Sequence, residues 1–156
     1  MKKNFKGFTL VELIVVIAII GVLAAIIVPS IMIYVKKSRQ QANNSDAKTI
    51  FNNLAAYAEE LHFDEDSTTL ADGIYCYGGT ISGATTNKAL NKKILEGADP
   101  TVSEKKVLVK FVNGSFPKVI VARSDSDDYF GCFPDPRHGN TGKYSEKALA
   151  MIQAAK

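Results

Sequence analysis

An uninterrupted apolar segment near the N-terminus limits how this chain can fold. From Leu13 to Val28, 16 consecutive residues have no polar side chain. The wider stretch Phe8–Val35 would be about 42 Å long as an α-helix, which exceeds the roughly 30 Å of a bilayer's hydrocarbon core. The sequence therefore predicts one helix that can cross a membrane, followed by a polar region that can form only a small core.

Glu12 distinguishes this stretch from an ordinary signal sequence. A secretory signal peptide has a shorter apolar part and a small-residue cleavage site, whereas Pro29-Ser30 is followed here by more apolar residues. A simple signal anchor fits the length but needs no carboxylate, which costs about 2.5–3.5 kcal/mol near the centre of a membrane helix. Glu12 either has a binding partner or lies near the interface, where snorkelling lowers its cost; we favour the partner.

The basic N-terminal residues account for the net charge. The formal net charge is +3, and Lys2, Lys3 and Lys6 all precede the apolar stretch. Without residues 1–7 the chain has 16 basic and 16 acidic residues. The charge therefore indicates a targeting segment rather than a nucleic-acid-binding face, and we expect no specific nucleic-acid site.

The hexapeptide Gly7-Phe8-Thr9-Leu10-Val11-Glu12 resembles the processing signature of type IV pilins and pseudopilins. In that family a short basic leader ends in glycine, the next residue is commonly phenylalanine, and glutamate is the fifth residue after the cut. The apolar helix that follows is retained. The resemblance covers about a fifth of the chain. It is specific, because charge, glycine, aromatic, acid and apolar run all occur at fixed offsets.

The resemblance implies roles for five residues. A membrane-bound prepilin peptidase would cut between Gly7 and Phe8 and then N-methylate Phe8. Glu12 would pair with the new N-terminal amine of a neighbouring copy, and each of these charges is costly in hydrocarbon unless the two come together. Gly21 and Pro29 resemble the positions at which the helix of a pilin is loosened.

After Val35 the apolar residues become periodic. They recur every three or four positions, which is the spacing of an amphipathic helix. These residues are Ala47, Ile50, Phe51, Leu54, Ala58 and Leu61. One helix is therefore expected from Phe8 to about Leu61, with a kink or a melted turn at Pro29, which lacks an N–H. The expected organisation is a leader over 1–7, a transmembrane and assembly helix over 8–35, and a globular domain over 36–156 that includes the second half of the helix.

A β-hairpin is predicted in the second half of the chain. Val107–Val112 and Lys118–Arg123 are rich in β-branched residues, and Asn113-Gly114 between them is a strong hairpin-turn signal. Gly73–Ile81 is a weaker strand that glycines interrupt. Two further elements are expected: a short helix or turn over Lys88–Glu96 and a last helix over Glu146–Ala155. The fold class is therefore α+β, a long helix packed on a small antiparallel sheet, which the resemblance to pilins also implies.

Cys76 and Cys132 are the only cysteines, and neither has a further cysteine or a histidine at zinc-ligand spacing. In an exported chain such a pair is expected to form one disulfide, whereas in a cytosolic chain it would remain as two buried thiols. Aromatic residues flank both cysteines, which indicates that both lie on a face of the sheet and near one another. We therefore predict a Cys76–Cys132 bridge.

The sequence contains no recognisable catalytic constellation. His62 and His138 have no motif around them, and we expect neither an enzyme nor a cofactor. Asp125, Asp127 and Asp128 could donate oxygens to Ca²⁺, as the resemblance to some pseudopilins suggests, but no EF-hand spacing follows them. A solvated loop is the favoured interpretation of this acidic tract.

Three basic residues follow the apolar stretch. Lys36, Lys37 and Arg39 are expected at the membrane surface near lipid phosphates. They equal the leader lysines in number, so the distribution of positive charge does not orient the helix. Placing the C-terminal domain outside the cell rests on the resemblance alone.

The resemblance implies a structural subunit of a type IV pilus that serves adhesion, twitching motility or biofilm formation. Its expected partners are other copies of itself, minor pilins, the prepilin peptidase, an assembly platform with its ATPase, and the membrane before assembly. It would be a single-pass bacterial membrane precursor and later part of a surface filament. The alternatives are a pseudopilin of a type II secretion system, a competence pilus subunit and, from another class, a membrane-anchored domain that never polymerises.

Overall fold

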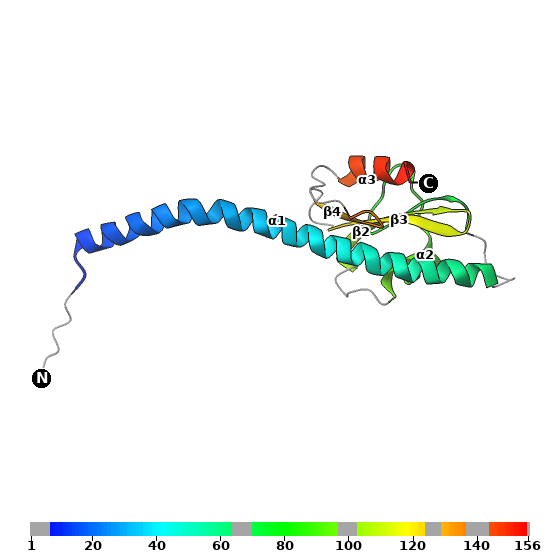
Figure 1. Cartoon of the computed structure of the whole chain (residues 1–156), viewed down its shortest axis with the longest axis horizontal. Helices are drawn as coiled ribbons and strands as arrows, with labels where there is room; N and C mark the ends of the chain where they lie inside the picture. Colours follow the sequence, from blue (N-terminus) through cyan, green and yellow to red (C-terminus); the bar gives the residue numbers. More distant parts are fainter. Residues whose placement is uncertain (1–6, 64–69, 97–102, 124–128, 137–143, 156) are drawn as a thin grey trace, which may run out of the picture. The chain divides into compact units, whose positions relative to one another are not determined.

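The computed structural model describes residues 7–63, 70–96, 103–123, 129–136 and 144–155 (Figure 1). The chain divides into two compact units, Met1–Lys36 and Lys37–Lys156. The helices are α1 (Leu10–Phe63), α2 (Lys88–Leu95) and α3 (Tyr144–Gln153). The strands are β1 (Gly73–Tyr77), β2 (Lys105–Val112), β3 (Ser115–Arg123) and β4 (Phe130–Phe133). The predicted α+β fold is confirmed.

Helix α1 contains 54 residues and continues through Pro29. Pro29 has no N–H to donate to the carbonyl four residues earlier. Ser30 donates its hydroxyl to the Ile26 carbonyl at 3.3 Å, so one carbonyl of this turn has an additional partner. The melted turn that the sequence allowed at Pro29 is absent, and the single long helix is confirmed.

The first unit consists of the apolar part of α1. Every large apolar side chain from Phe8 to Val35 is exposed, by between 39% and 86%. The helix is long and apolar enough to cross a membrane by length and composition. Apolar surface of this extent is not stable in water and indicates contact with lipid or with other protein.

The second unit is built around an antiparallel sheet with strand order β1-β2-β3-β4. The predicted hairpin is confirmed as β2 and β3, joined by Asn113 and Gly114, whose φ angles of 49° and 78° fit a two-residue turn with the twist of a hairpin. The predicted weaker strand ends earlier than expected, as β1. At the next residue, Gly78, φ is 73° and an added Cβ would lie 2.1 Å from the Lys105 carbonyl oxygen, so only glycine fits.

Both faces of the sheet are covered, by α1 on one side and α3 on the other (Figure 1). On the first face α1 packs through the apolar stripe that the sequence predicted, which includes Ala47, Ile50 and Leu54, and α2 adds Leu90 and Ile94. Helix α3 covers the second face through Ala148 and Ile152, over Leu108 and Ile120. Among the described residues after Val35, only Leu95 is a large apolar side chain that is exposed.

The predicted disulfide is wrong for this fold, because the two cysteines lie on opposite edges of the sheet. Cys76 pairs with Leu108, Leu108 with Ile120, and Ile120 with Cys132, so these residues form one row across four strands. Three strand spacings separate the cysteines by about 14 Å, whereas the Cα atoms of a disulfide are at most about 7 Å apart. The cysteines do share a face, as expected, but both are buried thiols without a disulfide.

The outer edges of β1 and β4 are both hydrogen-bonded. At β1, Cys76 donates its N–H to the Thr85 carbonyl at 2.9 Å, and the Thr85 N–H donates to the Ile74 carbonyl at 2.8 Å. At β4, the Cys132 N–H donates to Asn44 Oδ1 at 3.1 Å. Strand edges with unpaired backbone groups tend to pair with other chains, so these contacts protect the sheet from edge-to-edge association.

Candidate assembly site

The residues at the predicted cleavage point precede α1. Gly7, Phe8 and Thr9 are not helical, and an added Cβ on Gly7 would have no atom within 4 Å. Phe8 is 86% exposed. The Gly7–Phe8 peptide bond therefore lies in accessible, non-helical backbone, which is the form that a peptidase can bind. Residues 1–6 of the predicted leader lie outside the described residues.

Thr9 and Glu12 form a capping box at the start of α1. The Glu12 carboxylate oxygen Oε2 accepts the Thr9 backbone N–H at 2.8 Å and the Thr9 hydroxyl at 2.7 Å. In return the Glu12 N–H donates to Thr9 Oγ1 at 3.3 Å. This reciprocal pattern satisfies donors that the first turn of a helix otherwise leaves unpaired.

The capping box changes what the sequence alone suggested for Glu12. The spacing Thr-x-x-Glu before an apolar run is itself a capping signal, which neither a partner in another copy nor an interfacial position of Glu12 takes into account. Glu12 has an intrachain partner in the isolated subunit. Its charge is hydrogen-bonded there, and no cation among the described residues forms an ion pair with it.

Gly21 and Pro29 both lie inside the helical part of the apolar unit. No atom within 4 Å would obstruct a Cβ on Gly21. Glycine in a helix interior costs about 1 kcal/mol relative to alanine. In the part of the chain that the structure describes, no packing contact requires glycine at this position.

Comparison with known proteins also identifies the N-terminal segment as a family motif. The model of the family described as prokaryotic N-terminal methylation motif matches residues 2–28. A fimbrial protein of Dichelobacter nodosus is 34% identical over 114 residues, which are 73% of this chain and 65% of that protein. The type IV wide pilus major component PilA4 of Thermus thermophilus is 37% identical over 67 residues, 43% of this chain and 48% of the relative.

The chain belongs to the type IV pilin and pseudopilin family.

The family also includes secretion proteins. The type II secretion system core protein G of Escherichia coli is 44% identical over 57 residues, 36% of this chain and 39% of that protein. The chain spans less than two thirds of the length of each of these relatives. No solved structure matches it significantly. The matched relatives are named as pilus and secretion-system components, so the family is a structural one rather than one of enzymes.

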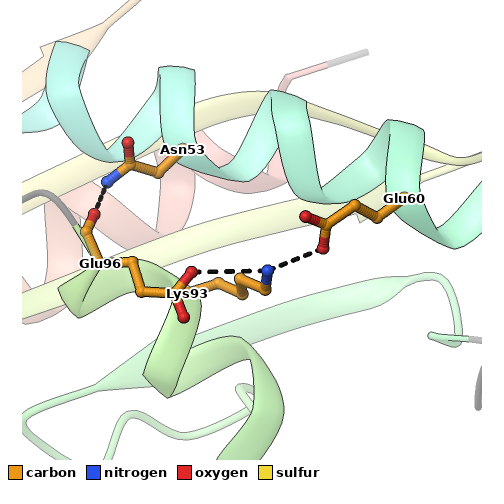
Figure 2. Close-up of polar contacts among 4 residues, drawn as sticks. All are labelled: Asn53, Glu60, Lys93 and Glu96. Atoms are coloured by element: carbon orange, nitrogen blue, oxygen red, sulfur yellow. Dashed lines mark hydrogen bonds and ion pairs between the residues drawn. The ribbon is translucent and has the colours of Figure 1, made fainter.

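A polar cluster joins α2 to α1 in the globular unit of this chain (Figure 2). The Lys93 amine lies 2.7 Å from Glu60 and 3.4 Å from Glu96, and 5.3 Å from the centre of the Tyr57 ring. The Asn53 amide donates to the Glu96 backbone carbonyl. The hydrogen bond that the Lys93 amine donates to Glu60 raises the pKa of Lys93, and the nearby carboxylate charges of Glu60 and Glu96 add to this effect. The charged and polar groups of the cluster are paired with one another. The cluster therefore fixes α2 against α1 and has a structural role.

A second ion pair holds the sheet to α1. The Lys105 amine contacts the Asp46 carboxylate, and the two side chains are only 10% and 16% exposed. Replacing either residue of such a largely buried pair by a neutral one would leave the other charge without a partner and poorly solvated. The pair therefore has a structural role, because it fixes how β2 lies against α1.

The described residues contain no group of three side chains that could hold a metal ion. The weak calcium candidates Asp125, Asp127 and Asp128 lie outside the described residues. The prediction about that loop therefore stays a prediction.

Proposed function

We propose that this chain is a structural subunit of a type IV pilus. The observation that carries the proposal is the continuous exposure of large apolar side chains from Phe8 to Val35 on a helix whose other half is packed. Such a surface needs lipid before assembly and other copies of the same helix afterwards. The globular unit, with a covered sheet and little exposed apolar surface, would face water on the outside of the cell.

Processing would remove residues 1–7 and create a new amine at Phe8. A membrane-bound prepilin peptidase would hydrolyse the Gly7–Phe8 bond and methylate the amine, which keeps its positive charge. The accessible, non-helical backbone at this bond supports the proposal. The capping box survives the cut, because Thr9 and Glu12 both lie after it.

Glu12 would then change partner on assembly. In the membrane-held subunit its carboxylate accepts two hydrogen bonds from Thr9, which lower the cost of a charge in hydrocarbon. In the filament a neighbouring subunit's Phe8 amine would neutralise it, which the Thr9 hydroxyl cannot do. Pairing of two charges that are each costly in an apolar core would select the correct axial stagger of one subunit against the next.

Loosening between Gly21 and Pro29 would adapt the helix to its neighbours. Pro29 removes one backbone hydrogen bond, and Gly21 adds conformational freedom without a packing role in the single chain. The assembly platform with its ATPase would draw the subunit from the membrane, and minor pilins would share the same helical interface.

A pseudopilin of a secretion system or of a competence pilus is the second candidate. The match to the Escherichia coli secretion protein is close but covers 36% of this chain, whereas the match to the Dichelobacter nodosus fimbrial protein covers 73%. The longer match favours the pilus. Membrane-held domains that never polymerise are disfavoured by the exposed glycine and carboxylate within the apolar helix.

The proposal is tested by expressing the chain in a pilus-assembling strain that lacks its own major pilin. Electron microscopy of the sheared surface fraction, with an antibody to residues 37–156, should show labelled filaments, and mass spectrometry of that fraction should show chains that start at methylated Phe8. A Gly7→Leu variant should accumulate uncut in the membrane. Filaments built from chains that still start at Met1 would contradict the processing step, and unlabelled shear fractions would contradict the pilus.

A further inference from the structure

Three exposed cations, Lys36, Lys37 and Arg39, lie directly after the membrane-spanning stretch, and the inference concerns the last two. Lys37 and Arg39 are both exposed on α1. Neither side chain makes an ion pair or hydrogen bond within the part of the chain that the structure describes. From residue 13 to residue 45 the sequence contains no acidic residue, and the next one, Asp46, is already paired with Lys105. No carboxylate of the same helix is therefore available to Lys37 or Arg39.

The helix length places these cations at the level of lipid headgroups. From Leu10, where α1 begins, to Lys37 the rise is about 40 Å at 1.5 Å per residue, and a bilayer with its headgroups is about 40–45 Å thick. An upright helix whose Phe8 end lies at one surface thus brings Lys37 and Arg39 to the phosphates of the opposite leaflet.

The two side chains point to different sides of the helix. Residues two apart are separated by about 200° around an α-helix, so Lys37 and Arg39 lie on nearly opposite sides. A single protein partner docked on one side would meet one of them, whereas headgroups surround a transmembrane helix and meet both. The arrangement therefore fits a membrane surface better than a protein patch.

We propose that Lys37 and Arg39 form a binding site for the headgroup phosphates of anionic phospholipids, which holds the unassembled subunit at a fixed depth. The inference rests on the proposed function only in requiring that Phe8–Val35 spans a bilayer. Arginine binds a phosphate through two parallel N–H groups, and lysine adds a point charge. Anionic lipids would then be released as the subunit leaves the membrane for the filament.

The test uses the full chain in nanodiscs of equal parts phosphatidylglycerol and phosphatidylcholine. Native mass spectrometry after gentle release should show phosphatidylglycerol retained over phosphatidylcholine by about tenfold or more. The double variant Lys37→Gln/Arg39→Gln should retain the two lipids almost equally, because each cation near the surface contributes about fivefold to the preference. The control Lys88→Gln/Lys92→Gln removes the same charge from exposed positions on α2 and should keep the full preference. Inorganic phosphate added in excess should not displace the lipid.

Each other outcome overturns the inference. Equal retention of the two lipids by the unmodified chain contradicts it, as does an equal loss in the α2 control, which would mean that only net charge matters. Displacement by inorganic phosphate would assign the site to free anions. An unchanged lipid preference with fewer filaments in the double variant would assign the cations to a protein partner. Resistance of the chain to alkaline carbonate extraction is measured in parallel, because loss of membrane insertion would contradict the proposed function instead.

Discussion

The two halves of α1 share one backbone conformation and differ in where their apolar side chains find contact. In the first half the apolar residues surround the helix, and Ile20 is 58% exposed. In the second half they form one stripe, and Ile50 is completely buried against the sheet. The pattern of apolar side chains, rather than helix formation itself, therefore decides whether a helix is covered by its own chain or by other molecules.

An acidic residue placed in each half should give opposite results. Ile50→Asp should unfold a fragment spanning residues 37–156, because it removes a buried side chain worth about 2–5 kcal/mol and buries a carboxylate, against a typical domain stability of about 5–15 kcal/mol. Circular dichroism of the fragment measures this. Ile20→Asp should leave the domain folded in the full chain but prevent membrane insertion and filament formation.

Leucine at the same two positions is the matched control, and it should cost less than about 1.5 kcal/mol at residue 50. A folded Ile50→Asp fragment, or normal filaments from Ile20→Asp, would mean that the two halves do not differ as described.

Removing the Glu12 charge should abolish assembly while leaving insertion intact or improved. Glu12→Ala removes both the capping box and the proposed pairing with a neighbour's amine, and stranding one member of a buried pair costs about 3–5 kcal/mol. Glu12→Gln keeps an oxygen that can accept from Thr9 but has no charge, so it should retain helix capping and still fail to assemble. Filament yield in a strain without the unmodified subunit is the measurement. Normal filaments from Glu12→Gln would leave capping as the only role of this residue.

Two glycines extend the comparison between the halves. An alanine Cβ at Gly131 on β4 would lie 2.2 Å from the backbone carbon of Asn43, so Gly131→Ala must push β4 away from α1 and should destabilise the fragment by about 1–3 kcal/mol. Gly21→Ala meets no atom within 4 Å and should stabilise the apolar helix by about 1 kcal/mol. Thermal unfolding of the fragment and of the full chain in detergent measures the two effects. An unchanged midpoint for Gly131→Ala would contradict the close β4–α1 contact.

The smallest expected effect is alkaline loss of stability in the globular unit. Burial of the Tyr75 ring raises its pKa, the nearby charge of Asp72 adds to this, and the hydroxyl donates to the Ala71 carbonyl at 2.6 Å. Because its pKa is higher in the folded than in the unfolded chain, the neutral Tyr75 hydroxyl adds to the free energy of unfolding. This stabilisation is complete below about pH 10, the ordinary tyrosine pKa, and is lost as pH rises through the pKa of the folded state. The raised pKa of Lys93 acts in the same direction. Urea unfolding of the fragment from pH 8 to 11 should show the decline, and Tyr75→Phe should make it shallower.

The parts of the fold that the sequence predicted are those with a local signal. The apolar stripe from Ala47 to Leu61 and the Asn113-Gly114 turn both depend on residues a few positions apart, so their periodicity and turn chemistry are visible in the chain. The last helix was also predicted, although it begins at Tyr144 rather than Glu146. The α+β fold class was predicted from the long helix, the hairpin and the last helix taken together.

The parts that were missed depend on distant residues. Strand β4 has four residues including Gly131, and it is defined by pairing with β3 and by Asn44, 88 residues away from Cys132. The disulfide prediction failed because cysteines on one face can still be three strands apart, and strand order is not a local property. At the candidate site the local Thr9–Glu12 capping signal was present in the sequence and was missed, while the partner of Glu12 in another copy stays a prediction.

The most direct test asks what covers the apolar half of α1. A photo-crosslinking phenylalanine derivative is placed at Ile20, which is exposed in the single chain, and in a second chain at Leu54, which is completely buried within it. Sheared filaments are irradiated and run on a denaturing gel. The Ile20 position should give a ladder of dimers and higher multimers of this chain, and the Leu54 position should give monomers only. Monomers alone from Ile20, or crosslinks only to unrelated proteins, would contradict the account of α1 as a helix completed by other copies.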